Sequence, residues 1–143
     1  MVERKHLSFF VFITLLVLVF DQATKLFIIL LKPALDFPLL KIHMVTNTGA
    51  GFGILQGRTI LLAIISLVVA SFVVASYPKL PQEKLPQFLF AVFLGGVLGN
   101  MLDRFFRSYV VDFIDFGFWP AFNIADTAIT LAVTGLVIYY WKK

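Results

Sequence analysis

The sequence has no cysteine and few charged residues. None of its 143 residues is a cysteine, which excludes a disulfide, a thiolate nucleophile and a cysteine-based metal site. Only 14% of the residues are charged, whereas a soluble domain has about a quarter. The net charge of +4 is spread over scattered residues, so nucleic-acid binding, which needs a basic patch, has no support.

Apolar residues are correspondingly abundant. They make up 60% of the chain, and the mean hydropathy is +0.95. Four apolar stretches, residues 7–31, 59–76, 88–104 and 121–141, approach the roughly 20 residues that span a bilayer. Backbone groups in lipid must be hydrogen-bonded within the chain, and no β-barrel repeat is present, so each stretch is predicted to be a helix. The sequence thus predicts an all-α membrane protein with four transmembrane helices in a single domain, residues 1–143.

The first apolar stretch has a second interpretation, because Arg4 and Lys5 precede it. Signal peptides begin in this way. The stretch is long for a signal peptide, however, and no small-residue cleavage site follows it. Apolar residues also resume after Lys25. A transmembrane helix is therefore the preferred interpretation.

The basic residues favour one orientation by a small margin. Four spans place both termini on one side, and the loops and ends on that side contain Arg4, Lys5, Lys79, Lys84, Lys142 and Lys143. The opposite loops contain Lys32, Lys41, Arg58 and Arg107. The excess predicts that both termini are cytoplasmic. The loop over residues 32–58 has alternating apolar residues and a glycine-rich turn, so we expect short β-strands at the extracytoplasmic surface.

Most of the acidic and amide side chains then gather at one depth, near the outer surface. The alternation of the helices brings these residues together: Asp21, Lys25, Asn47, Asn100, Asp103, Arg104, Asp112, Asn123 and Asp126. Asp103 and Arg104 are expected to form an ion pair, and Asp21 and Lys25 lie one helical turn apart. Acids in a membrane segment are costly and mark functional sites by default.

Asp112 and Asp126 differ from the other acids because apolar residues surround each of them. Neither has an arginine or lysine within four residues. Two such carboxylates close together cannot easily both ionise. One would keep a proton and polarise a carbonyl, while the other would activate water, as in an aspartyl hydrolase. A proton-coupled transporter or channel that uses the same acids as a relay stays open. So does a structural protein in which they are folding anchors.

The remaining polar residues have plainer interpretations. Asp115 is expected to be a solvated loop acid and His43 a surface residue, so a two-histidine metal site has no support. Asn47, Asn100 and Asn123 are candidates for helix caps or turns, or for hydrogen bonds to a substrate backbone. The spacing of Gly95 and Gly99 predicts that a neighbouring helix approaches closely.

Five motifs occur in order along the chain. They are Asp21-Gln22-x-x-Lys25, Asn47-Thr48-Gly49-Ala50-Gly51-Phe52-Gly53, Gly95-Gly96-x-x-Gly99-Asn100-x-x-Asp103-Arg104, Val111-Asp112-Phe113-Ile114 and Phe122-Asn123-x-Ala125-Asp126. Together with the length and the four apolar stretches, they resemble the bacterial lipoprotein signal peptidases, also called signal peptidase II. The chain departs from that family at Gly51, where alanine is more common, and in a short loop between Asp112 and Asp126.

The resemblance implies a specific activity. Members of the family cleave the signal peptide from prolipoproteins just before a cysteine that carries a diacylglyceryl group. The catalytic pair corresponds to Asp112 and Asp126. Residues expected to bind substrate or support the pair are Asp21, Lys25, Asn47, Gly49, Asn100, Asp103, Arg104 and Asn123. The resemblance further implies no metal and no cofactor. We expect a monomer in contact with membrane lipids, with an active site near the extracytoplasmic face of the bacterial cytoplasmic membrane.

Overall fold

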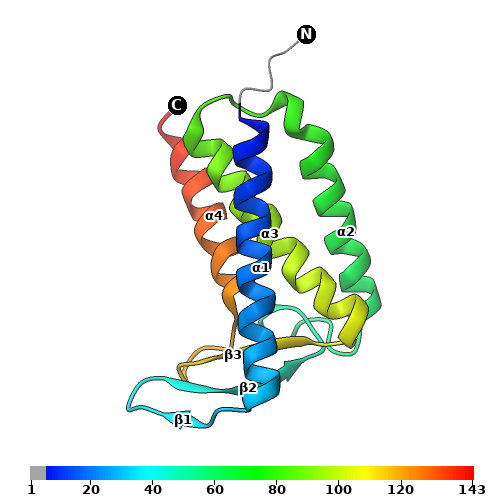
Figure 1. Cartoon of the computed structure of the whole chain (residues 1–143), viewed down its shortest axis with the longest axis vertical. Helices are drawn as coiled ribbons and strands as arrows, with labels where there is room; N and C mark the ends of the chain where they lie inside the picture. Colours follow the sequence, from blue (N-terminus) through cyan, green and yellow to red (C-terminus); the bar gives the residue numbers. More distant parts are fainter. Residues whose placement is uncertain (1–5) are drawn as a thin grey trace.

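The computed structural model describes residues 6–143, apart from the side chain of Phe52. It contains four long helices, α1 (Leu7–Leu31), α2 (Thr59–Ser76), α3 (Lys84–Arg107) and α4 (Ile124–Trp141) (Figure 1). All four are long and apolar enough to cross a membrane. The predicted fold class, a four-helix membrane protein, is therefore confirmed. Arg4 and Lys5, which contribute to the predicted orientation, lie outside the described residues.

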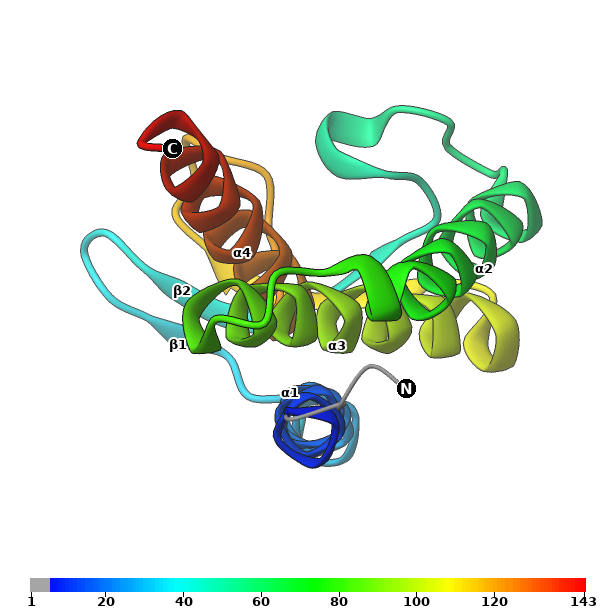
Figure 2. The same ribbon diagram turned by 90° about the horizontal axis from the view of Figure 1, so that it is seen from above.

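Helix α3 lies at the centre of the bundle, and the other three helices pack around it (Figure 2). Glycines allow this close packing. A Cβ atom at Gly95 would lie 2.7 Å from the Cβ atom of Val17 in α1, and one at Gly96 would lie 2.6 Å from the carbonyl oxygen of Ala125 in α4. The predicted close approach at the glycine pair is confirmed, because Gly99 likewise lies against Asp21 of α1.

Two helices begin at residues other than those predicted. Helix α3 begins at Lys84 rather than 88, because Pro86 lies in its first turn, where the missing backbone N–H needs no partner. The buried Gln87 also ties this turn to the preceding loop, since its Nε2 donates to the carbonyl of Pro81 at 2.8 Å. Helix α4 begins at Ile124 rather than 121, because Asn123 is its N-cap residue.

A three-stranded antiparallel sheet covers one end of the bundle. Strands β1 (Leu35–Asp36) and β2 (Lys41–Asn47) form within the predicted loop, and β3 (Val110–Asp115) follows α3. Strand β2 pairs with β3 so that Val45 lies opposite Asp112. The sheet lies at the opposite end of the molecule from the start of α1 and the end of α4 (Figure 1). The sheet therefore brings β3 and the start of α4 together at one end.

Candidate active site

Asp112 lies in the middle of β3 with almost no exposed surface, since its exposed fraction is 1%. Two amide groups hold its carboxylate. Asn47 Nδ2 donates to Oδ2 at 3.0 Å, and Asn123 Nδ2 donates to Oδ1 at 2.7 Å. Strand pairing brings Asn47 to this point, because it ends β2 opposite Val110.

Asp126 lies in the first turn of α4 and is partly exposed. Asn100 Nδ2 of α3 donates to its Oδ1 at 2.7 Å. Asp126 also forms a capping box with Asn123. Its backbone N–H donates to Asn123 Oδ1 at 2.9 Å, and its Oδ2 accepts the backbone N–H of Asn123 at 3.3 Å. The local sequence thus fixes this carboxylate through the geometry of a helix start.

Asn123 joins the two aspartates. Its side chain accepts from the backbone of Asp126 and donates to the carboxylate of Asp112. The same Nδ2 lies 3.1 Å from Asn100 Oδ1 and 3.2 Å from the carbonyl of Val111. One fully buried amide therefore connects α3, β3 and α4 at the site.

Both aspartates line a cleft of about 370 Å³. Its polar wall contains Asn47, Asn100, Arg104, Asp112 and Asp126. Other parts of the wall come from the loop before α2, the loop before α4 and α4 itself, and include Ala50, Gly51, Gly53, Gln56, Trp119, Pro120, Ala121, Phe122, Ile129 and Thr130. The cleft is therefore polar on the side of the aspartates and more apolar elsewhere, which suits a peptide that carries apolar groups.

Burial is the main influence on the charge of Asp112, and the nearby carboxylate of Asp126 is the second. Together they raise the pKa of Asp112 to about 7, against the hydrogen bonds from Asn47 and Asn123 and the charge of Lys25, which lower it. Neutral amide donors stabilise a carboxylate less than a bonded cation would. Asp112 therefore changes protonation state near neutral pH.

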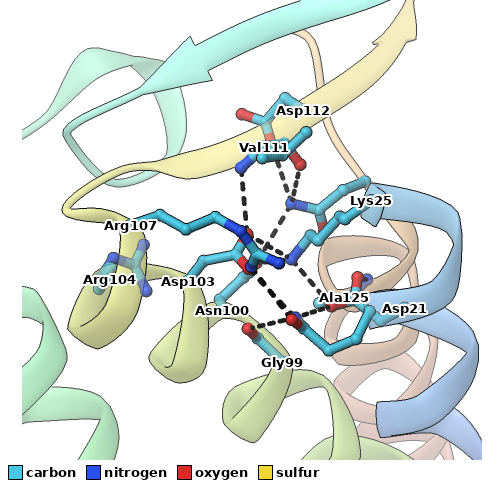
Figure 3. Close-up of polar contacts among 12 residues, drawn as sticks. Asp21, Lys25, Gly99, Asn100, Asp103, Arg104, Arg107, Val111, Asp112 and Ala125 are labelled. Carbon is cyan, nitrogen blue, oxygen red and sulfur yellow. Dashed lines mark hydrogen bonds and ion pairs between the residues drawn. The ribbon is translucent and has the colours of Figure 1, made fainter. Parts of the chain in front are cut away.

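A buried ion cluster contacts Asn100, one of the residues that line the cleft (Figure 3). Lys25 Nζ lies 2.8 Å from Asp21 Oδ2 and 3.0 Å from Asp103 Oδ2, and all three side chains are inaccessible to solvent. Lys25 also donates to Asn100 Oδ1 at 3.0 Å. The cluster is thus connected to the cleft through the same amide that bonds Asp126.

Comparison with known proteins identifies the family. Residues 13–142 match the family model described as signal peptidase (SPase) II. The chain belongs to the signal peptidase II family. It is therefore a protease, and the family is of the aspartic type.

Relatives and solved structures agree with this assignment. A lipoprotein signal peptidase of Halothermothrix orenii is 37% identical over 136 residues, which cover 92% of this chain and 94% of that protein. One from Caldanaerobacter subterraneus is 42% identical over 124 residues, or 82% and 83% of the two chains. Two structures of a bacterial membrane enzyme, solved by the in meso method at 2.3 and 1.9 Å resolution, are each 31% identical. Their TM-scores are 0.85 and 0.83, and they cover 95% and 96% of this chain and 89% and 95% of their own.

One ion pair in this signal peptidase II differs from the prediction. Asp103 pairs with Lys25 and with Arg107, not with Arg104. Neighbours along a helix point about 100° apart, whereas residues four apart share a face. Arg104 instead lines the cleft, and its Nη2 donates to the carbonyl of Gly49 at 3.3 Å. The predicted contact between Asp21 and Lys25 is present.

Gly49 is held where no side chain fits. Its backbone N–H donates to Asn47 Oδ1 at 2.9 Å, and an added Cβ atom would lie 2.8 Å from the carbonyl oxygen of Ile54. The short turn orients the Asn47 amide, because its oxygen is occupied by Gly49 and its nitrogen is left to face Asp112.

Asp115 and His43 lie on the sheet, away from the residues that line the cleft. The expectation that Asp115 is a solvated loop acid is wrong about the loop, since Asp115 ends β3 and lies 2.9 Å from His43 Nε2, but its side chain is partly exposed. The bond to His43, followed by the backbone N–H of Gly117, lowers the pKa of Asp115. Within residues 6–143, no three histidine, cysteine, aspartate or glutamate side chains are grouped so as to hold a metal ion.

The sequence interpretation missed two members of the buried cluster. Gln22 Nε2 lies 3.1 Å from Asp21 Oδ2, from the carbonyl of Gly99 and from Asp103 Oδ1. Arg107 donates to Gln22 Oε1 at 3.1 Å and to Asp103. The spacing of four residues between Asp103 and Arg107 could have identified the second contact. Gln22 stands in the first of the five motifs, but no local signal identifies its contacts with Gly99 and Asp103, because both lie far away in the sequence.

Proposed function

We propose that this signal peptidase II removes signal peptides from prolipoproteins that carry a diacylglyceryl group on a cysteine. The enzyme cleaves the peptide bond just before that cysteine, and Asp112 and Asp126 activate the attacking water. The observation that carries the proposal is the pairing of two carboxylates in one cleft, each held by amide N–H donors. The relatives named lipoprotein signal peptidase support the substrate class.

The proposed reaction uses one proton shared between the two aspartates. The protonated carboxyl group donates a hydrogen bond to the oxygen of the scissile carbonyl, and the ionised carboxylate accepts a proton from water. The water oxygen then bonds to the carbonyl carbon. When the tetrahedral intermediate collapses, the C–N bond breaks and the departing cysteine nitrogen takes up a proton from the pair. The pKa of about 7 at Asp112 supports a pair that keeps one proton at neutral pH.

The position of the cleft supports a substrate that is held at the membrane surface. The cleft is lined by residues of the sheet and of α3 and α4, at the end of the apolar helices opposite the start of α1 and the end of α4. Acyl chains on the substrate would stay in lipid and present the neighbouring peptide bond at that depth. We therefore place both termini in the cytoplasm and the cleft near the extracytoplasmic face of the cytoplasmic membrane, in agreement with the small excess of basic residues on the terminal side.

The alternative function, a proton relay for transport, has less support. A relay needs titratable groups along a path across the membrane. Among residues 6–143, the fully buried acids are Asp21, Asp103 and Asp112. All three belong to the hydrogen-bonded network around the cleft, at one end of the bundle. Such clustering suits local chemistry better than transport.

The test is cleavage of a defined substrate by the purified protein in detergent. A diacylglyceryl-modified prolipoprotein is incubated with the wild type and with Asp112→Asn and Asp126→Asn, and the products are identified by mass spectrometry. We expect cleavage just before the lipidated cysteine by the wild type, and loss of at least about a thousandfold in either variant. Asp115→Asn is the matched control, since Asp115 lies in the same strand but outside the cleft.

Full activity of either dyad variant would contradict the proposed catalytic pair. If the folded wild type did not cleave the substrate, the peptidase activity itself would be in doubt. Proton-coupled flux in liposomes would then be measured, because the relay predicts flux without proteolysis.

A further inference from the structure

Two buried carboxylates bind the backbone N–H of the residue that precedes each member of the proposed catalytic pair. Asp103 Oδ2 accepts the backbone N–H of Val111 at 3.1 Å, and Val111 precedes Asp112. Asp21 Oδ1 accepts the backbone N–H of Ala125 at 2.8 Å, and Ala125 precedes Asp126. The same type of contact is thus made at the same relative position for each member of the pair (Figure 3).

We propose that Asp21 and Asp103 are positioning residues, bridged by Lys25, that set the spacing between Asp112 and Asp126. The inference rests on the proposed function, because it concerns the geometry of that pair. It gives the buried cluster a specific role, which is to fix the position of β3 relative to α4.

Lys25 is suited to this task because its three N–H groups have three acceptors. Its Nζ lies 2.8 Å from Asp21, 3.0 Å from Asp103 and 3.0 Å from Asn100 Oδ1. An ammonium group has three donors and no acceptor, so the contacts use its full capacity in a site without solvent. A single residue of α1 therefore fixes the distance between the two carboxylates that hold the backbone.

Lys25 also determines which way the Asn100 amide faces. A cation next to Asn100 requires the amide oxygen on that side, so Nδ2 must face Asp126. The donor to Asp126 is thus aligned by the same ammonium group that bridges Asp21 and Asp103. Lys25 therefore affects both the position of the catalytic pair and the hydrogen bond that Asp126 accepts.

Stability alone gives a poor account of this cluster. Desolvation of buried ions costs about as much as their attraction returns, and well-packed apolar side chains are often as stable. Apolar side chains could not accept the N–H groups of Val111 and Ala125, however. The close contact between Gly99 and Asp21 further limits movement of that carboxylate, since a Cβ atom at Gly99 would lie 2.5 Å from Asp21 Oδ2.

The test separates positioning from folding by comparing two substitutions of Asp103. Asp103→Leu removes the acceptor for Val111, whereas Asp103→Asn keeps an amide oxygen there. We expect kcat to fall about 100-fold in the leucine variant and about 3- to 10-fold in the asparagine variant, because displacement of a reacting group by about 1 Å costs up to 100-fold. KM for the diacylglyceryl-modified prolipoprotein should stay within about threefold of wild type in both, because the cleft wall is unchanged.

Thr14→Val is the matched structural control. Thr14 is buried where α1 meets α3, and its Oγ1 lies 2.9 Å from the carbonyl of Phe10 in α1 and 3.3 Å from that of Ala91 in α3, but it has no contact with the catalytic pair. We expect its thermal stability to fall while kcat stays within about twofold of wild type. If Thr14→Val lowered kcat as much as Asp103→Leu, general weakening of the contact between α1 and α3 would explain the loss and positioning would be refuted.

The remaining outcomes are equally decisive. A wild-type kcat in folded Asp103→Leu overturns the inference but leaves the proposed function intact, provided that Asp112→Asn is inactive. If the leucine variant does not fold, the asparagine variant decides, and an unchanged kcat in it overturns the inference. Turnover by Asp112→Asn would remove the catalytic pair and the positioning role together.

Discussion

The four aspartates around the cleft are held in two different ways. Asp21 and Asp103 each contact Lys25, so their charge is compensated by a bonded cation. Asp112 receives its side-chain hydrogen bonds from the amides of Asn47 and Asn123, and Asp126 receives one from the amide of Asn100. Amides orient a carboxylate without neutralising it, and the buried Asp112 can therefore keep a proton. The choice of neighbour thus agrees with the proposed roles, in which Asp21 and Asp103 hold structure and Asp112 exchanges a proton.

Asp112 should make the wild type less stable as the pH rises. Its pKa is about 7 in the folded protein and near 3.8 as a model compound. Between these values the unfolded chain loses its proton while the folded protein keeps it, so the free energy of unfolding falls as pH rises from about 4 to about 7 and is level above that. Asp112→Asn cannot ionise. We expect the variant to gain a few kcal/mol relative to wild type across this interval.

The measurement is a series of thermal melts in detergent between pH 4 and pH 8, with Asp115→Asn as the comparison. Asp115 has a lowered pKa. The difference in stability between Asp115→Asn and wild type should therefore show the opposite dependence on pH, or none, in this range. If the difference in melting temperature between Asp112→Asn and wild type were the same at every pH, burial would not raise the pKa of Asp112.

Two glycines near the site should respond differently to the same substitution. An added Cβ atom at Gly99 would lie 2.5 Å from Asp21 Oδ2, whereas one at Gly51 would have no atom within 4 Å. Gly99→Ala should therefore displace Asp21 and lower both thermal stability, by roughly 1 to 3 kcal/mol, and the rate of cleavage. Gly51→Ala should leave both near wild type. Equal tolerance of the two substitutions would show that Asp21 can move without consequence.

At the scale of elements, the start of α4 has two tasks that can be separated. Asn123 caps the helix with its oxygen and donates to Asp112 with its nitrogen. Asn123→Ser retains a capping oxygen but is too short to reach Asp112, whereas Asn123→Ala loses both. We expect both variants to lose most of the peptidase activity, and the serine variant to be more stable by about 1 kcal/mol. Cleavage rates and melting temperatures of the two variants test this, and an active serine variant would show that the donor to Asp112 is dispensable.

The helices could be predicted because their signal is local. Each is a predominantly apolar stretch, and the errors lie at the ends, where Pro86 is tolerated in a first turn and Asn123 forms a cap. Strand β3 was not predicted. Its six residues, Val110–Asp115, are short, and their pairing partner is β2, more than 60 positions earlier in the chain. The sequence of either segment alone contains no signal for pairing with so distant a partner.

The sequence predicted which residues gather at the cleft, but not which hydrogen bonds and ion pairs they form. The acids and amides of the motifs do meet at one end of the bundle, as the alternation of helices requires. Which of them bond was less accessible, because adjacency in the sequence suggested Asp103 with Arg104, and the fold pairs Asp103 with Lys25 and Arg107 instead. The contacts to the backbone of Val111 and Ala125 depend on tertiary packing alone.

At the scale of the whole molecule, the sheet, whose residues help to line the cleft, lies at the opposite end from the start of α1 and the end of α4 (Figure 1). The loop before α4, which helps to line the cleft, carries Phe118 with 82% of its surface exposed. The connection between α2 and α3 carries the exposed Gln82 at the terminal end. Phe72 lies in α2 between these ends and is 70% exposed in the isolated chain. Insertion in a bilayer should place these three side chains in three different environments.

The absence of cysteine from the chain makes this arrangement testable by labelling single-cysteine variants with a membrane-impermeant maleimide. Phe118→Cys should react in intact cells if the cleft end faces outward, as proposed. Gln82→Cys should then react only after the membrane is permeabilised, because the proposed orientation places its loop in the cytoplasm. Phe72→Cys should stay unreactive in both conditions, since apolar lipid surrounds its helix and excludes the charged reagent. If Gln82→Cys were the one variant to react in intact cells, the orientation would be the reverse of that proposed. A substrate whose lipidated cysteine lies at the extracytoplasmic surface could then not reach Asp112 and Asp126.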